Sequence, residues 1–340
     1  MPRESSLTPL QGFLTGVPLC IYFVCHRVWR KRVARGRKSV YRSLCETVDG
    51  VKHLKSVDWE SRGSFMNGYV RLEKPVIVRN FVKKWVAAKK WTPEFFLNYV
   101  TPTRPEGSIT SPTVTVSVGN EESSTSGSHK EKISLREYME GIIEKKKKHK
   151  VAGCGVSHSP YLKQLDVFQA LPALKKDIDA NPFSWWHSVF RSTYLWIGGH
   201  GSMTGLHNDD ENNVLCQIYG KKTVYLYPPE TRAFLYVNGN YDSGTECCDV
   251  DVVDSAAEQY PNFSRAKPFE IKCSLTPGDM LYIPKFWYHQ VISDENSVSI
   301  SVNHFVSSPP EFARHGVKRV FFDFLHFYLS YKRGECVCCG

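Results

Sequence analysis

The chain has 340 residues, of which 41% are hydrophobic, enough for one large domain or two ordinary ones, which excludes a chain disordered throughout. Its formal net charge is +10, but two basic runs at residues 27–38 and 145–150 carry more positive charge than that. The remainder is close to neutral, which argues against a globular domain built around a nucleic-acid groove. Its eleven cysteines, an odd number without paired C-x-x-C motifs, argue against a disulfide scaffold or zinc cage.

Residues 1–57 are predicted to precede the folded domain. Residues 13–25 (FLTGVPLCIYFVC) are apolar and are followed by a basic run, which is typical of a short signal anchor that contacts a membrane through residues 10–38. The basic flank would keep the next domain in the cytosol. An arginine-rich, acid-free stretch at residues 5–45 alternatively indicates an organelle transit peptide, and a buried helix is a third interpretation. The mitochondrion, nucleus and cytoplasm are therefore alternative locations.

The first half of the folded domain is predicted to mix strands and helices. Apolar runs indicate strands, and a capping residue before such a run indicates a helix start. The predicted elements are strands at residues 75–81 (PVIVRNF) and 113–118 (TVTVSV), and helices beginning after Thr92 and after Ser134, where Glu137 completes a capping box. Residues 121–129 (EESSTSGSH) are small and polar and predict a mobile loop within the domain.

The second half is predicted to consist of many short strands separated by glycine and proline turns. The predicted strands are 194–197, 214–219, 223–227, 280–283 and 297–305. Gly220-Lys221 is predicted to form a tight hairpin, and Pro277-Gly278-Asp279 a turn into the strand before His289. This succession predicts a mainly β protein with a double-sheet jelly roll and flanking helices.

Beyond residue 309 the pattern becomes helical and rich in aromatic residues. This C-terminal segment is expected to dock on the barrel or to pair with a second copy as a homodimer. The predicted organisation is therefore an N-terminal segment at residues 1–57, a jelly-roll domain at 58–310, and a C-terminal helical segment with a cysteine-rich tail at 311–340.

Three residues are candidate metal ligands: His207, Asp209 and His289, with the second histidine 82 positions after the first. Residues i and i+2 of a strand project to the same face, so His207 and Asp209 can bind one ion. Two imidazoles and one carboxylate leave three adjacent positions open, as non-haem iron(II) requires for a bidentate co-substrate and dioxygen. An H-x-D motif alone is weak, because it is common by chance. Asp210 and Glu211 follow immediately, but Asp210 is expected to point to the opposite face.

The surrounding sequence resembles the JmjC-domain cupin oxygenases, in particular their small hydroxylase branch. The resemblance lies in TGLHNDDENNVLCQIYGKKTVYLYPP (204–229) and SLTPGDMLYIPKFWYHQVISDENSVSISVNHF (274–305), and extends in general form over residues 59–310. It implies a double-stranded β-helix of the jelly-roll or cupin type that uses Fe(2+), 2-oxoglutarate and O2. It also implies the release of succinate and carbon dioxide.

The resemblance assigns Lys222 to the C5 carboxylate of 2-oxoglutarate, 15 residues after His207. A buried lysine needs such an anionic partner, whereas without the family a solvent-facing lysine beside a turn would be the simpler interpretation. Trp196 also matches a family position beside the pocket, but an aromatic residue in a core strand usually serves packing, so it is not included. The further co-substrate residues implied by the resemblance are Thr204, Asn213, Tyr161 and Asn303.

The activity implied by the resemblance is hydroxylation of a protein side chain. The sequence contains no zinc cage or histone-reading module of the kind that larger demethylases carry, which favours hydroxylation over demethylation of N-methyl-lysine or N-methyl-arginine. An RNA-modifying hydroxylase is an alternative that the basic runs support. A non-catalytic, membrane-tethered cupin scaffold is the other alternative, and the intact set of candidate ligands argues against it.

Overall fold

The computed structural model describes residues 44–100, 111–120, 122–124, 128–144, 149–150, 157–178, 183, 190–254, 258–333 and 335–337. The chain divides into two units, residues 1–46 and residues 47–340, and the fold described below is that of the second. The predicted membrane-contacting residues 10–38 lie outside the described part, so membrane attachment and location stay predictions. Among the helices in the described ranges, none has both the length and the apolar character to cross a membrane.

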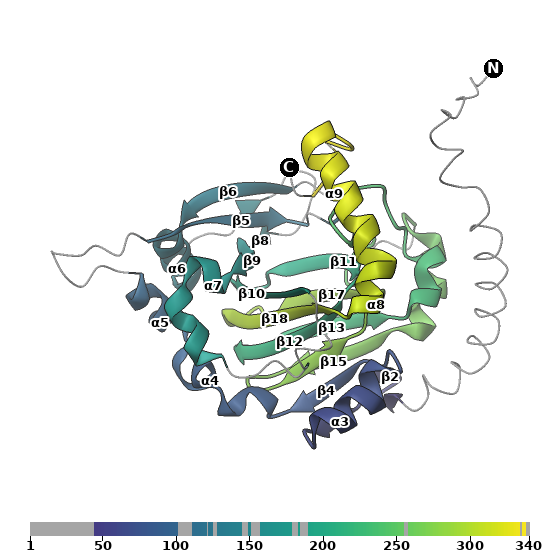
Figure 1. Cartoon of the computed structure of the whole chain (residues 1–340), viewed down its shortest axis with the longest axis horizontal. Coiled ribbons are helices and arrows are strands. Elements are labelled where there is room, and N and C mark those ends of the chain that lie inside the picture. The colour runs from purple at the N-terminus through teal and green to yellow at the C-terminus, as the bar shows by residue number, and fades with distance from the viewer. Residues whose placement is uncertain are drawn as a thin grey trace. The chain divides into compact units, whose positions relative to one another are not determined.

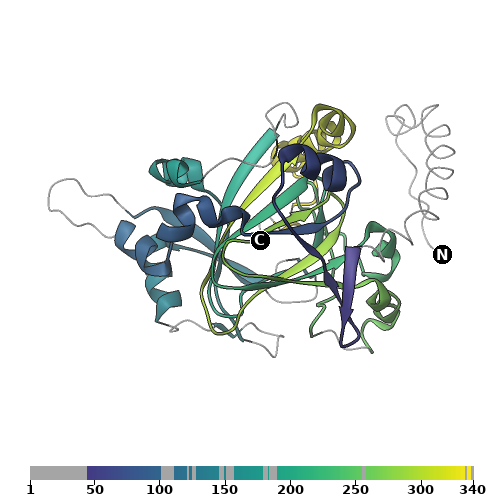
Figure 2. The same ribbon diagram turned by 90° about the horizontal axis from the view of Figure 1, so that it is seen from below.

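The two larger sheets lie in the middle of this unit, with helices at the outside (Figures 1 and 2). The first has the order β3 (Ser56–Asp58), β4 (Val76–Arg79), β16 (Met280–Ile283), β12 (Asn212–Tyr219), β18 (Ser299–Ser307), β10 (Phe190–Gly198), β9 (Tyr161–Asp166), β5 (Thr113–Gly119) and β6 (Ser128–Ser134). The second has the order β1 (Cys45–Val48), β2 (Val51–Leu54), β15 (Ile271–Leu275), β13 (Lys222–Tyr227), β17 (Tyr288–Ser293), β11 (Met203–Asp209) and β14 (Thr245–Cys247). A small pair joins β7 (His149–Lys150) to β8 (Ser157–His158).

Consecutive strands alternate between the two large sheets from β10 to β13 and again from β15 to β18. This alternation confirms the predicted jelly roll. It also shows that the predicted hairpin at Gly220-Lys221 is wrong, because β12 pairs with β16 and β18 whereas β13 pairs with β15 and β17. The turn at Gly220, where φ is +70°, instead carries the chain from one sheet to the other.

The predicted helix starts are confirmed, since Thr92 accepts a hydrogen bond from the Phe95 backbone and Ser134 accepts one from Glu137. The helices of the first half are α3 (Arg62–Phe65), η1 (Met66–Val70), η2 (Phe81–Lys84), α4 (Val86–Lys90), α5 (Pro93–Tyr99), α6 (Leu135–Ile143), α7 (Val167–Ala170) and η3 (Pro172–Asp177). The later ones are η5 (Pro229–Phe234), η6 (Pro261–Arg265), η7 (Lys267–Phe269), α8 (Pro309–Glu311), η8 (Phe312–Gly316) and α9 (Val317–Leu329).

The main core lies between the early helices and the nine-stranded sheet. Trp91, Phe96 and Tyr138 pack in one buried cluster with Tyr282 of β16 and Val302 of β18. Full burial of each such side chain contributes roughly 1.5–3 kcal/mol, so this cluster holds the helices on the sheet. The opposite face of the sheet is thereby left to line the interior of the barrel.

The prediction of a mobile loop at residues 121–129 is wrong where the structure describes these residues. Glu122 and Ser123 are buried, and residues 128 and 129 already belong to β6, which pairs with β5 along its whole length. The polar composition of the segment gave no indication of the buried residues or of the start of β6, because burial of a carboxylate depends on partners that are distant in the sequence.

Helix α9 confirms the predicted docking of the C-terminal segment on the barrel, and it lies beside β11 (Figure 1). Its inward face makes polar contacts beside the half-buried Phe322 and Leu325: Arg319 contacts Asp210, Asp323 accepts from Ser243, and His326 is fully buried. Its outward face carries seven apolar side chains that are each more than half exposed. These are Val317, Val320, Phe321, Phe324, Phe327, Tyr328 and Leu329.

Candidate active site

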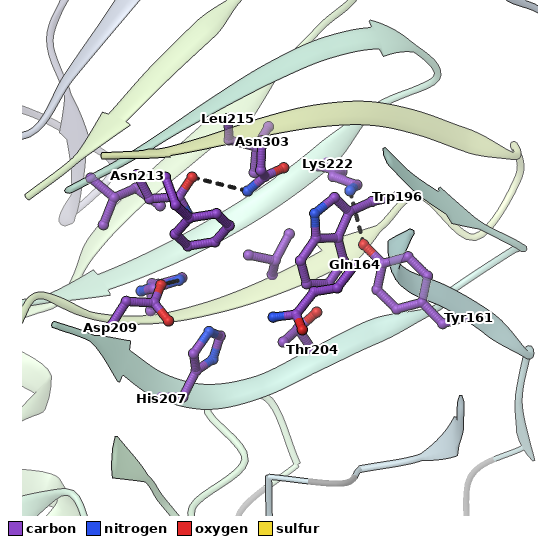
Figure 3. Close-up of a pocket in the computed structure, with 14 residues that line it drawn as sticks. Tyr161, Gln164, Trp196, Thr204, His207, Asp209, Asn213, Leu215, Lys222 and Asn303 are labelled. Carbon is purple, nitrogen blue, oxygen red and sulfur yellow. Dashed lines mark hydrogen bonds and ion pairs between the residues drawn. The ribbon is translucent and has the colours of Figure 1, made fainter. Parts of the chain in front are cut away.

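The two candidate histidine ligands lie opposite each other on paired strands. In the antiparallel register of β11 and β17, His207 faces His289, and the centres of their rings are 4.2 Å apart. Asp209 ends β11, two residues beyond His207, and its Oδ2 is 3.6 Å from Nε2 of His289. One ligand atom from each of the three residues lies within 4.8 Å of the others, so they form a single cluster. Figure 3 shows His207 and Asp209 on the same side of the pocket.

Both histidines are held with Nε2 available to bind a metal. Nδ1 of His207 is 2.8 Å from the carbonyl oxygen of Gly205, and Nδ1 of His289 is 3.0 Å from that of Trp287. A carbonyl only accepts, so each Nδ1 carries the proton and each Nε2 keeps its lone pair. Burial lowers the pKa of His207 and lowers that of His289 to about 4. Both rings are therefore neutral at pH 7, as metal ligands must be, and the contact of His289 with Asp209 is not an ion pair.

Asp209 has the features of a ligand that lacks its cation. Burial raises the pKa of its carboxyl group. Oδ1 has a long contact of 3.4 Å from Thr245 Oγ1, and the buried Oδ2 has no hydrogen-bond partner among the described residues. Burying an unpaired carboxylate is unfavourable, and a bound cation removes that cost. Ligand atoms on adjacent positions of an octahedral ion are about 3 Å apart for bonds of about 2.1 Å, so the three residues fit iron(II) after a small adjustment.

The neighbouring acidic residues point elsewhere. One guanidinium nitrogen of Arg319 lies 2.8 Å from Asp210 and 3.0 Å from Glu211. Ser307 donates a further hydrogen bond to Glu211. The preference for Asp209 over Asp210 thus agrees with the geometry, because only Asp209 reaches the cluster with the histidines.

Lys222 enters the same pocket from the first position of β13. It is 2% exposed, and its Nζ donates to Tyr161 Oη at 3.0 Å (Figure 3). It also donates to Ser301 Oγ at 2.7 Å. Burial lowers its pKa to about 7. No carboxylate forms an ion pair with it within the part of the chain that the structure describes. The pocket therefore has an uncompensated cation at one end, which is suited to binding an anion.

All eight residues singled out in the sequence line this one pocket: Tyr161, Thr204, His207, Asp209, Asn213, Lys222, His289 and Asn303. They come from β9, β11, β12, β13, β17 and β18, so both sheets contribute. Asn303 and Asn213 also contact each other, with Nδ2 of the former donating to Oδ1 of the latter at 3.1 Å. The two amides thereby fix each other's orientation at the pocket wall.

Six further residues line the pocket. Trp196, which the sequence analysis set aside as a packing residue, is one of them, and its buried Nε1 has no hydrogen-bond partner among the described residues. Gln164 lines it from a bulge in β9, where its φ is +51°, and no sequence pattern indicated this bulge. The remaining lining residues are apolar: Leu215, Ile283, Val291 and Phe305. Strand alternation could have placed these four residues in the pocket, because they lie on the same face of their sheet as the predicted site residues.

A buried ion pair lies behind His207. Glu122 accepts a hydrogen bond from the backbone of Gly205 at 2.9 Å and pairs with Lys163 at 3.0 Å. Burial opposes its ionisation, but the charge of Lys163 and the hydrogen bond from Gly205 lower the pKa of the carboxyl group. Gly205 in turn accepts from His207, so the ion pair supports the segment that orients this ligand.

Comparison with known proteins agrees with the fold. The model of the family described as "Cupin-like domain" matches residues 62–312, and the chain therefore belongs to that family. It is 26% identical over 252 residues to Jumonji C domain-containing protein 5 of Drosophila melanogaster, a match that covers 73% of the chain and 59% of that protein. The resemblance to JmjC-domain proteins is thus confirmed.

Two further relatives differ in the substrates that their names indicate. The lysine-specific demethylase JMJ30 of Arabidopsis thaliana is 30% identical over 70% of this chain and 51% of its own length. The human tRNA wybutosine-synthesizing protein 5 is 36% identical over 40% of this chain and 41% of its own length. The chain thus spans about half the length of the curated relatives that it matches.

Proposed function

We propose that the protein is an iron(II)- and 2-oxoglutarate-dependent dioxygenase that hydroxylates a protein side chain and releases succinate and carbon dioxide. The observation that supports this proposal is the distribution of charge in one pocket. Two neutral imidazoles and a carboxylate converge at one end, and the unpaired ammonium of Lys222 is buried at the other. A dicarboxylic 2-oxo acid matches both ends, since it offers chelating oxygens to a metal and a distant carboxylate to a cation.

Each group of residues has a defined task in this proposal. His207, Asp209 and His289 hold iron(II) from one side and leave the other positions open. Lys222 binds the C5 carboxylate, and Tyr161 orients its ammonium through the 3.0 Å contact. The remaining co-substrate residues in the proposal are Thr204, Asn213 and Asn303. When bound, iron and 2-oxoglutarate activate O2 and supply the oxidation, while the apolar pocket wall keeps bulk water away.

A protein substrate is proposed first, and RNA second. The lysine-specific demethylase among the relatives supports a protein side chain. The wybutosine-synthesizing protein has the higher identity, although over a shorter stretch, and this observation favours a tRNA nucleoside as the second candidate. On a methylated amine the same chemistry would release formaldehyde and give demethylation. The target atom therefore decides between hydroxylation and demethylation.

We also propose that the outward face of α9 pairs with a second copy of the chain. The helix docks partly through Arg319, Asp323 and His326 and still exposes seven apolar side chains, whereas a surface helix usually exposes polar ones. The combined exposed area of the seven apolar side chains is on the order of the roughly 800 Å² per partner that a standard interface buries. The molar mass in solution tests this, and replacing Phe324 and Tyr328 by serine should give monomers.

The activity is tested with the full chain loaded anaerobically with iron(II) and then exposed to O2, with succinate as the readout. The expected result is succinate formation that is abolished in both His207→Ala and Lys222→Ala. Lys221→Ala is a matched control, because Lys221 precedes β13 and is exposed. A wild-type protein that binds neither iron(II) nor 2-oxoglutarate would instead support the non-catalytic scaffold. To find the class of substrate, peptide, methylated peptide and tRNA are each added to the active enzyme and the increase in succinate is compared.

A further inference from the structure

Asp209 is the first of three consecutive acidic residues at the end of β11. Asp210 and Glu211 follow it, and both have carboxylates long enough to reach a metal held beside Asp209 if the turn were free to move. Carboxylates are good ligands for divalent cations, so a flexible acidic run offers several competing ways to coordinate one ion. The chain therefore needs a feature that keeps the second and third carboxylates away from the metal.

Arg319 of α9 occupies the position that such a feature requires. It contacts both unwanted carboxylates through one nitrogen, at 2.8 Å from Asp210 and 3.0 Å from Glu211. All three side chains are at most 17% exposed, so water screens these ion pairs weakly. Two backbone hydrogen bonds complete the restraint on this turn: Asp210 donates to Gly244 at 2.8 Å, and Phe286 donates to the carbonyl of Asp209 at 2.7 Å.

We propose that Arg319 is a positioning residue that reserves Asp209 for the metal by holding Asp210 and Glu211 out of the coordination sphere. The inference rests on the metal site of the proposed function. It extends that site to the C-terminal helix, which contributes no residue to the pocket lining. The metal is then bound by His207, Asp209 and His289, without Asp210 or Glu211, only while α9 is docked.

Simple electrostatics predicts a different effect of removing Arg319. A cation near a metal site repels the metal ion, so its loss should tighten metal binding and leave the set of ligands unchanged if charge alone mattered. If Arg319 instead positions the turn, its loss should admit additional carboxylate ligands. A change in the set of ligands therefore separates the two roles, whereas both predict tighter binding.

The test uses Co(II) bound to the metal-free full chain, because its ligand-field absorption reports the number and geometry of ligands. Affinity is measured in parallel by competition with a chelator. Arg319→Gln is expected to change the absorption spectrum, because Asp210 or Glu211 joins the ligands, and to bind Co(II) at least as tightly as the wild type. Lys318→Gln removes the same charge from the neighbouring, exposed position of α9 and is expected to leave both unchanged.

Rescue gives the decisive comparison. The triple variant Arg319→Gln, Asp210→Asn, Glu211→Gln removes the competing carboxylates together with the residue that restrains them, and it is expected to recover the wild-type spectrum. If Arg319→Gln alone does not fold, the triple variant is compared directly with wild type. An unchanged spectrum in Arg319→Gln, whatever its affinity, or a folded triple variant with an altered spectrum, would overturn the proposal.

Failure of the metal site itself has a different signature. In that case the wild-type protein and His207→Ala would bind Co(II) equally weakly, and the proposed function would fall together with this inference. If the wild type binds Co(II) through His207 but Arg319→Gln behaves like the wild type, only the role of Arg319 is lost.

Discussion

Lys222 Nζ lies 3.0 Å from Tyr161 Oη, so a buried ammonium has a neutral hydroxyl as its partner at the bottom of the pocket. Ser301, the other acceptor, is also neutral. Burying a cation without an anion lowers the stability of the folded chain, and the binding of an anion offsets this penalty. Lys222 therefore links stability to ligand binding, and the first three predictions test this link.

Replacing Lys222 by methionine should separate stability from function. The variant keeps a side chain of similar length but leaves the carboxylate of bound 2-oxoglutarate unpaired, so we expect affinity to fall by at least about a hundredfold. The free energy of unfolding without ligand should stay equal or rise, because a buried charge has been removed. Isothermal calorimetry and chemical denaturation measure the two quantities. A large loss of stability would contradict this account of Lys222.

The pH dependence of co-substrate binding follows from the same residue. With a pKa of about 7 in the empty pocket, Lys222 is charged below pH 7 and loses its proton as the pH rises above it. Since the anion needs the charged form, the dissociation constant for 2-oxoglutarate should rise above pH 7 by up to about tenfold per unit, with proton uptake on binding. Lys222→Arg is the control, because a guanidinium stays charged and should remove this slope.

The stability of the ligand-free chain should rise with pH above 7, whereas the affinity for 2-oxoglutarate falls. The unfolded chain holds the lysine proton up to a pKa near 10.4, whereas the folded chain releases it at about 7. The unfolded state therefore binds more protons between these values, and the contribution of Lys222 to the free energy of unfolding rises with pH in this window. Denaturation of wild type and Lys222→Met at pH 7 and pH 9 tests this, since only the wild type should gain stability from this source.

Gly220, which lies two residues before Lys222, should be important for the stability of the fold. Its φ is +70°, and an added Cβ would overlap the carbonyl oxygen of Val298. Gly220→Ala is expected to lower the free energy of unfolding by about 2–4 kcal/mol, from overpacking and left-handed strain together. Gly50→Ala is the matched control: its φ is +77° but the added Cβ would meet nothing within 4 Å, so it should show the strain alone. Equal losses in the two variants would contradict the overlap with Val298.

The sequence predicted the pocket better than the pairing of the strands. The period-2 spacing of His207 and Asp209 needs only a local strand, and the family resemblance located the distant His289 and Lys222. Strand pairing depends on contacts between distant segments, so a glycine turn at Gly220 looks the same whether it closes a hairpin or links two sheets. For this reason the fold class was predictable but the hairpin was not.

The missed polar residues share one physical cause. Glu122 lies in a serine-rich stretch, and Arg319 lies in an aromatic helix, so neither segment suggests a buried ion pair. Each is explained by a partner far along the chain, Lys163 for Glu122 and Asp210 for Arg319. Such pairs are defined by the folded structure and leave no periodic pattern in a single sequence.

Trp196 should contribute a hydrogen bond to the co-substrate. Its ring centre is 5.8 Å from that of Tyr161, which places it at the end of the pocket that holds Lys222, and its Nε1 has no partner among the described residues. Trp196→Phe keeps most of the ring but removes the donor, so the KM for 2-oxoglutarate should rise about tenfold. Trp85→Phe is the control, because its Nε1 also lacks a partner in the described ranges but lies in the helix-packed core. Equal effects of both changes on KM would point to altered packing.

Metal binding should stabilise the folded chain through Asp209 and the two histidines. An ion that binds only the folded state at a hundred times its dissociation constant adds about 2.7 kcal/mol to the free energy of unfolding. For a domain of this size that corresponds to a rise in Tm of roughly 5 °C. Differential scanning fluorimetry of the metal-stripped chain with and without Mn(II) measures this shift, which should vanish in His207→Ala. His207→Ala also alters stability, so the change in Tm on adding Mn(II) is measured for each protein separately. An equal change in Tm in both proteins would mean that the ion binds outside the cluster.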